Sequence, residues 1–309
     1  MSRPRLICIV GPTASGKSAV ALELAKKLNA EVVSADSMQV YRYMNIGTAK
    51  PSSHEMGGIP HHLMDVVNPD EDFSASDYRE KARAVIDDIH KRDKRVIVAG
   101  GTGLYVRALT KGLVDTPEAD PLLRAKLKKE AEEKGALYLH RRLEEIDPEA
   151  AREIHTNNLV RVIRALEVAT LTGRKISAFQ QSHQFSEKAY DFFMVGIDVE
   201  REVLYRRIEE RVDAMVASGL EAEVRGLLDM GYGRELKSMR AVGYKEMCAH
   251  VLDGIPLERA VELIKRDSRR YAKRQITWFK KEELRWLRRE EVLNSEFMNS
   301  AESFMESNE

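Results

Sequence analysis

The chain has few cysteines, no long apolar run and no net charge. Its two cysteines, Cys8 and Cys248, lie far apart in 309 residues, which argues against a disulfide framework and predicts a reduced, cytoplasmic setting. No apolar stretch approaches the ~20 residues that a membrane-spanning helix needs, so we expect no contact with a membrane. The first ten residues lead directly into an apolar run, and we expect no signal peptide there.

Basic and acidic residues balance at 50 each, which argues against a general nucleic-acid coat. The charge is nevertheless uneven, because eleven lysines and arginines stand against three acidic residues between Lys265 and Arg289. This excess of +8 predicts one face that meets phosphates. Four aromatic residues interleave with it, and we expect a helix that packs them inward and turns its arginines outward: Tyr271, Trp278, Phe279 and Trp286.

The stretch GPTASGKS, residues 11–18, lies between the apolar run RLICIV and the helix-like AVALELAKKL. It matches G-x-x-x-x-G-K-[ST], in which backbone N–H groups surround phosphate oxygens at the positive end of a helix. We expect the N–H groups of residues 13–18 to face a phosphate, Lys17 to supply charge and Ser18 to ligate Mg²⁺; the alternative is an ordinary tight turn. The predicted phosphate-binding residues are Gly11, Pro12, Thr13, Ala14, Ser15, Gly16, Lys17 and Ser18.

Short runs rich in valine and isoleucine alternate with helical patterns before residue 115, and one more such run spans residues 191–199. This alternation is typical of βαβ units and a parallel sheet, whose ligands gather at the carboxyl ends of the strands. We therefore predict an α/β fold, a P-loop NTPase-like parallel sheet flanked by helices, with an inserted all-helical domain. Three loops should lie at its ligand-binding edge, at residues 11–18, 35–39 and 100–103.

The pattern changes to consecutive helices from about residue 116 and returns to a strand near residue 190. We predict a catalytic core formed by residues 1–115 and 190–289, and a helical insertion at 116–189. The last segment is polar and acidic, and we expect residues 290–309 to form a flexible tail.

Asp36 ends the apolar run AEVVSAD, whereas the run KRVIVAGG at residues 94–101 carries no acid. Nucleotide hydrolases with this kind of loop hold Mg²⁺ with an acid at a strand end. From the residues alone, Asp36 could be a metal ligand, a base, or a residue that caps a helix or turn. The adjacent His61 and His62 point to opposite faces if they lie on a strand, which argues against a metal pair.

Further motifs follow the phosphate loop in order and at plausible spacing: SADSMQVYRYMNIGTAKP (34–51), PHHLMD (60–65), FSASDYRE (73–80), VAGGTGLYVRAL (98–109), NNLVRVIRALEV (157–168), ASGLEAEV (217–224), MRAVGYKEM (239–247) and RRYAKRQITWFK (269–280). With these motifs the chain resembles the tRNA dimethylallyltransferases, also called tRNA isopentenyltransferases, over about residues 5–285. The acidic tail lies outside the resemblance.

The resemblance implies transfer of a dimethylallyl group from dimethylallyl diphosphate, with Mg²⁺, to N6 of the adenosine immediately 3′ of the anticodon. The tRNAs concerned read codons that begin with U. The loop at 11–18 would then hold the diphosphate of the donor and hydrolyse no nucleotide. As partners we expect the anticodon stem-loop of tRNA and dimethylallyl diphosphate, and we expect the enzyme to be a monomer.

The same resemblance implies a role for several residues. Asp36 would be the general base, Thr102 would orient the amine, and Arg211 would close on the diphosphate opposite Lys17. The target base must leave its stack to react, and Gln39 would contact its edges. The insertion at 116–189 would bind tRNA, and the residues expected to contact tRNA are Asp36, Ser37, Met38, Gln39, Thr102, Arg124, Val160, Arg161, Val162, Ile163 and Arg164.

Three other functions fit part of the sequence. A free-nucleotide dimethylallyltransferase would share the loop and Asp36, but needs neither the insertion nor the basic segment. A P-loop kinase would turn over ATP and would place a cluster of arginines near the phosphates. An RNA-binding module without activity would leave the set of Lys17, Ser18 and Asp36 without a purpose.

Overall fold

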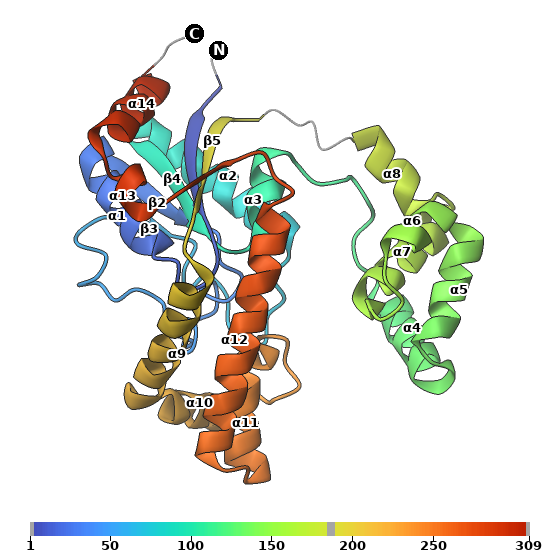
Figure 1. Ribbon diagram of the computed structural model, residues 1–309. Coiled ribbons are helices and arrows are strands. Elements are labelled where there is room, and N and C mark those ends of the chain that lie inside the picture. The colour runs from blue at the N-terminus through green and yellow to red at the C-terminus, as the bar shows by residue number, and fades with distance from the viewer. Residues whose placement is uncertain (1–2, 184–188, 307–309) are drawn as a thin grey trace. The chain divides into compact units, whose positions relative to one another are not determined.

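The computed structural model describes residues 3–183 and 189–306 (Figure 1). The end of the expected insertion, 184–188, and the last residues of the expected tail, 307–309, lie outside the described residues. The chain divides into two compact units, one formed by Met1–Thr110 with Ala189–Glu309 and the other by Lys111–Lys188. The second unit therefore begins at Lys111, where the sequence suggested residue 116. No helix in the described ranges is both long and apolar enough to cross a membrane.

The first unit is built on a six-stranded sheet in the order β3-β2-β4-β1-β5-β6, with all neighbouring strands parallel. This confirms the predicted α/β fold with a parallel sheet flanked by helices. Two short edge strands, β3 and β6, were not expected from the sequence. The strands are β1 (Arg5–Val10), β2 (Ala30–Ser34), β3 (His61–His62), β4 (Arg95–Gly100), β5 (Asp191–Ile197) and β6 (Arg285–Leu287).

Alternating residues of the central strand bury its two faces against different helices. On β1, Leu6, Cys8 and Val10 belong to the core that includes α2 (Ala75–Lys91) and α3 (Gly103–Thr110). Ile7 and Ile9 pack instead with α1 (Lys17–Leu28) on the other face. Because helices cover both faces of the sheet, the sequence of β1 is a continuous apolar run from Leu6 to Val10.

The remaining helices of the first unit follow β5, and α12 runs beside α9 below the sheet (Figure 1). The expectation that one helix carries all four aromatic residues of the basic segment 265–289 is wrong for Trp286, because α12 ends at Phe279 and Trp286 lies in β6. The elements are α9 (Arg201–Ala217), α10 (Leu220–Asp229), the 3₁₀ helix η1 (Ser238–Arg240), α11 (Tyr244–Asp253) and α12 (Leu257–Phe279).

The C-terminal segment is ordered, and the expectation of a flexible tail is wrong for its described part. Residues Arg289–Val292 form α13 and Ser295–Glu306 form α14. Phe297, Met298 and Ala301 of α14 are buried in the same core as α1. Three apolar residues at helical spacing supply a buried face that the polar composition of the segment hides.

In its described residues, 111–183, the second unit has five helices around a core of its own. Leu127, Leu139, Leu143, Val162 and Leu166 are each buried there. Every regular element in these residues is a helix, as the sequence indicated for this region. Its helices are α4 (Pro121–Lys134), α5 (Ala136–Ile146), α6 (Pro148–Glu153), α7 (Leu159–Thr172) and α8 (Ile176–His183).

Candidate active site

Three loops meet at the carboxyl edge of the sheet, after β1, β2 and β4. The loops after β2 and β4 are joined by backbone bonds, because the Thr102 N–H donates to the Ala35 carbonyl at 3.1 Å. The Ser37 N–H donates to Thr102 Oγ1 at 2.9 Å. A Cβ at Gly100 would lie 2.1 Å from the Ala35 oxygen, so this close approach needs glycine. Thr102 and the segment after Asp36 therefore form one surface.

The loop after β1 folds around the Pro12 carbonyl, which accepts from Lys17 Nζ at 3.2 Å and from the Ser15 N–H at 3.3 Å. The Thr13 N–H donates to Gln275 Oε1 at 2.8 Å. The expectation that every N–H group from 13 to 18 faces a phosphate is therefore wrong for Thr13 and Ser15. The hydroxyl of Ser15 is buried without a hydrogen-bond partner inside the loop.

Two cationic side chains converge on this loop from different helices. Lys17 begins α1, and Arg211 on α9 donates from Nη1 to Thr13 Oγ1 at 3.3 Å. Desolvation lowers the pKa of Lys17 to about 8; the Asp36 carboxylate opposes this shift and the Arg211 charge adds to it. Desolvation also lowers the pKa of Arg211, again against the effect of Asp36. The loop thus holds two poorly solvated cations, an arrangement that favours binding of an anion.

Asp36 caps the turn that follows β2. Its Oδ1 accepts from the Met38 N–H at 2.9 Å and from the Gln39 N–H at 3.4 Å. The capping role that the sequence left open is therefore present. The carboxylate also acts on the charges of Lys17 and Arg211, so it lies next to the anion-binding loop as well as next to Thr102.

Gln39 does not offer its amide to a ligand. The side chain is 9 % exposed, and its Nε2 donates to the carbonyls of Thr48 and Ala49, at 3.3 Å each. Its Oε1 accepts from Ser34 Oγ at 3.2 Å. In this structure the Gln39 amide is therefore not free to contact the edges of a base, because its oxygen bonds Ser34 before the Asp36 turn and its nitrogen bonds the chain after it.

Two residues of α12 complete the site and were not expected from the sequence. Burial and the Asp36 charge raise the pKa of Tyr271, while Arg274 and a hydrogen bond between Tyr271 and Thr102 oppose the rise. Gln275 lies one helical turn further and contacts the loop after β1. Both belong to the motif at residues 269–280, where their spacing of four could have indicated one shared face.

The family model for IPP transferase matches residues 39–282. The chain belongs to the IPP transferase family. It is 55 % identical over 278 residues to the tRNA dimethylallyltransferase of Geobacter metallireducens, which covers 90 % of both chains. A crystal structure of the full-length tRNA isopentenylpyrophosphate transferase of Bacillus halodurans is similar with a TM-score of 0.73 and 42 % identity, over 98 % of this chain and 97 % of that one.

A further similar structure is that of a eukaryotic dimethylallyltransferase acting on tRNA. Its TM-score is 0.82 at 30 % identity, and the match covers 98 % of this chain and 79 % of that one. These findings confirm the family that the motifs predicted. An IPP transferase is an enzyme that transfers a group, so the kinase and the module without activity are no longer needed to explain the chain.

In this member of the IPP transferase family, two of the arginines expected to contact tRNA pair with a buried carboxylate. Glu167 is 0 % exposed; it accepts from Arg124 at 2.8 and 2.9 Å and from Arg164 at 2.5 Å. Burial opposes ionisation, but these bonds lower the pKa of Glu167. Arg164 also donates to Thr116 Oγ1 and to the Pro117 carbonyl. Arg164 therefore holds the entry segment of the insertion against α7, and Arg124 joins α4 to α7 through Glu167.

Only part of the segment 160–164 is exposed. Val162 and Ile163 are buried in the insertion core, so their side chains offer no surface to tRNA, and the expected contact of these two residues with tRNA stays a prediction. Val160 is 81 % exposed, and Arg161 is exposed beside it. The helical period explains the split, because positions 160 and 161 lie on the outer face of α7 while 162 and 163 turn inward.

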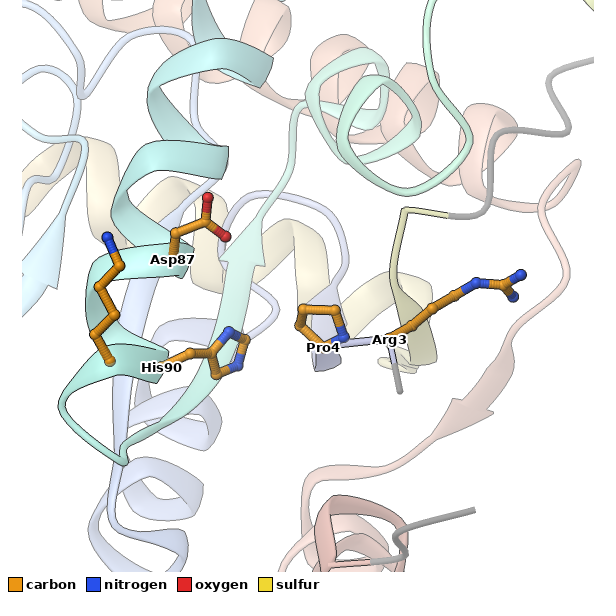
Figure 2. A pocket seen from close by; sticks show the side chains of 5 residues that line it. Arg3, Pro4, Asp87 and His90 are labelled. Atoms are coloured by element: carbon orange, nitrogen blue, oxygen red, sulfur yellow. The ribbon is translucent and has the colours of Figure 1, made fainter. Parts of the chain in front are cut away.

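A pocket at the opposite ends of the strands, before β1, stands apart from these loops. Figure 2 shows it from close by, between the chain before β1 and the end of α2. Its volume is about 510 Å³. It is lined by Arg3, Pro4, Asp87, His90 and Lys91. Ligands of parallel α/β folds bind at the carboxyl ends of the strands, so this depression is not the candidate active site.

Proposed function

We propose that the chain transfers a dimethylallyl group from dimethylallyl diphosphate to N6 of the adenosine immediately 3′ of the anticodon, in tRNAs that read codons beginning with U. One observation carries the proposal: an anion-binding loop and an acceptor surface meet at Asp36. Lys17 and Arg211 converge on the loop, and Thr102 and Ser37 form the proposed acceptor surface. A reaction that joins an anionic donor to an amine needs a site for the donor anion beside a site for the amine.

The reaction breaks an allylic C–O bond and forms a C–N bond. The lone pair of N6 attacks the allylic carbon, and the electrons of the broken bond leave with the diphosphate. Lys17 and Arg211 lie where this negative charge grows, and they stabilise it in a site poor in water. N6 loses a proton to Asp36, which acts as the general base. Thr102, held by the Ser37 N–H, orients the incoming amine.

Mg²⁺ fits the residues of the loop. The described ranges contain no group of three or more His, Cys, Asp or Glu side chains that could hold a metal by themselves. A hard cation that keeps several waters and binds mainly through substrate phosphates suits such a site. Ser18, exposed at the start of α1, would hold the ion, which when bound supplies further positive charge to the leaving diphosphate.

The proposal is tested by incubating the chain with dimethylallyl diphosphate, Mg²⁺ and unmodified tRNA, with AMP and ATP as parallel acceptors. Transfer to the tRNA adenosine alone is expected. Transfer to AMP or ATP at a comparable rate would instead identify a free-nucleotide dimethylallyltransferase. A tRNA in which guanosine replaces the adenosine 3′ of the anticodon serves as the matched acceptor control.

The lowered pKa of Lys17 predicts how donor use depends on pH. Lys17 is charged below its pKa of about 8 and neutral above it, and the diphosphate binds the charged form. The value of kcat/KM for the donor should therefore be level below pH 8 and fall above it, because at saturating tRNA this ratio reports the enzyme–tRNA complex before the donor binds. The measurement is initial rate against pH at saturating tRNA. Lys17→Arg keeps its charge throughout, so an unchanged alkaline fall in that variant would contradict the assignment.

Arg161 and Arg164 should behave differently when each is changed to alanine. Arg161→Ala removes an exposed charge, so the slope of log K against log salt for tRNA binding should decrease by about one, without loss of stability. Arg164→Ala deprives the buried Glu167 of a partner and should cost roughly 1–3 kcal/mol of unfolding free energy. The measurements are tRNA affinity at several salt concentrations and thermal unfolding.

The matched control for this comparison is Arg141→Ala, which removes an exposed arginine from α5 of the same unit. If Arg141→Ala and Arg161→Ala change the salt slope equally, tRNA senses only the total charge of the insertion. A salt slope unchanged in Arg161→Ala would show that Arg161 does not contact a phosphate.

A further inference from the structure

Gln275 is a buried polar side chain that connects the two halves of the site. It projects from α12 and is 6 % exposed. Its Oε1 accepts from the Thr13 N–H at 2.8 Å, and its Nε2 donates to the Gly101 carbonyl at 3.0 Å. The amide oxygen of Gln275 thus bonds the loop after β1, and the amide nitrogen bonds the loop after β4. No other residue type of similar size offers both groups in one plane.

Each of these bonds reaches a residue next to a functional group. The Thr13 hydroxyl accepts a hydrogen bond from Arg211. The bond between the Thr13 N–H and Gln275 therefore holds Thr13 in place for Arg211. Gly101 precedes Thr102, whose hydroxyl accepts from the Ser37 N–H. Gln275 therefore acts on the donor side through Thr13 and on the acceptor side through Thr102.

The packing at Gly101 shows how closely the amide fits. A Cβ at Gly101 would lie 2.2 Å from Gln275 Nε2 and 3.3 Å from the Gly11 carbonyl oxygen. Any side chain at this position must displace the amide. The loops after β1 and β4 are thus joined through the Gln275 side chain that lies between them.

We propose that Gln275 is a positioning residue. It sets the separation between the loop after β1, which would hold the diphosphate, and the loop after β4, whose Thr102 would orient the amine. The inference rests on the proposed function and deepens it. Because Gln275 is buried, it acts without contacting tRNA, unlike the exposed arginines of the same helix. Its loss should change the use of the donor and the rate of transfer, and should leave tRNA affinity unchanged.

The experiment compares Gln275→Leu, which loses both bonds, with Gln275→Glu, which can still accept from Thr13 but cannot donate to Gly101. Thr277→Ala is the control, because its hydroxyl donates to the Lys273 carbonyl on the exposed side of α12. We expect kcat/KM for the donor to fall about tenfold in Gln275→Leu, with tRNA affinity within about twofold of the unchanged chain. Thr277→Ala should match the unchanged chain.

A second variant, Gly101→Ala, displaces the amide while Gln275 is retained. It should lower kcat/KM for the donor like Gln275→Leu, and the double variant should lose little more, because both changes break the same connection. Fully additive losses would overturn the proposal. So would a Gln275→Leu variant that binds tRNA more weakly while its donor kinetics stay unchanged, because that result would place the residue on the tRNA surface.

Affinity for inorganic diphosphate, measured by calorimetry, provides a readout that does not depend on turnover. It should weaken in Gln275→Leu and not in Thr277→Ala. If the unchanged chain fails to modify tRNA, the proposed function fails, and this measurement still decides the role of Gln275. If diphosphate affinity and kinetics are both unchanged in Gln275→Leu and Gln275→Glu, the proposal is wrong.

Discussion

The Asp36→Asn variant is expected to fold, to bind donor and tRNA, and to lose nearly all transfer activity. Asn can accept the N–H bonds of Met38 and Gln39 through its side-chain oxygen, as Asp36 does through Oδ1. The turn after β2 should therefore keep its shape. The amide cannot take the proton from N6, so the transfer rate should fall by roughly 10²–10⁴. The measurement is single-turnover transfer with preformed enzyme, donor and tRNA.

The pH of this assay matters because Asp36 also raises the pKa of Lys17. Removing the carboxylate lowers that pKa further, so the variant should be assayed well below pH 8, where Lys17 stays charged. A loss of donor affinity that extra Mg²⁺ restores would instead make Asp36 a metal ligand. Near-normal turnover would leave only the capping role, because Asn caps as well as Asp.

Much of the site could be predicted because its parts are local. The phosphate loop needs glycines and a lysine at fixed spacing, and the ends of β2 and β4 follow apolar runs that a parallel sheet buries. Parallel strands bring such ends to one edge. Lys17, Asp36 and Thr102 were therefore expected at one site, and the structure brings them together.

The rest depends on partners far away in the sequence. The amide nitrogen of Gln39 donates to carbonyls nine and ten residues further on, and Arg124 pairs with Glu167 across the insertion. Nothing in the local sequence pattern shows that a polar side chain will be held by such internal hydrogen bonds and ion pairs. Gln275 is the reverse case: its two partners lie at Thr13 and Gly101, and only the packing of α12 reveals that it belongs to the site.

Lys17→Ala is expected to leave the loop intact and to reduce transition-state stabilisation. The Pro12 carbonyl, which accepts from Lys17 Nζ, also accepts from the Ser15 N–H, so the turn does not depend on the lysine. The charge that faces the leaving diphosphate is lost in a poorly solvated place, which should cost roughly 2–4 kcal/mol. That loss corresponds to a decrease of about 30- to 1000-fold in kcat/KM for the donor.

Two comparisons separate this loss of charge from a change of shape. Lys17→Arg should recover part of the activity, because arginine restores the positive charge but places it differently from the lysine ammonium. Arg211→Ala should also lower kcat/KM, and the double variant should lose less than the sum of the two, since Lys17 and Arg211 act on the same leaving group. Unchanged turnover in Lys17→Ala would mean that the donor's diphosphate binds elsewhere. Equal losses in Lys17→Ala and Lys17→Arg would mean that the lysine acts through the shape of the loop, and the electrostatic account would then fail.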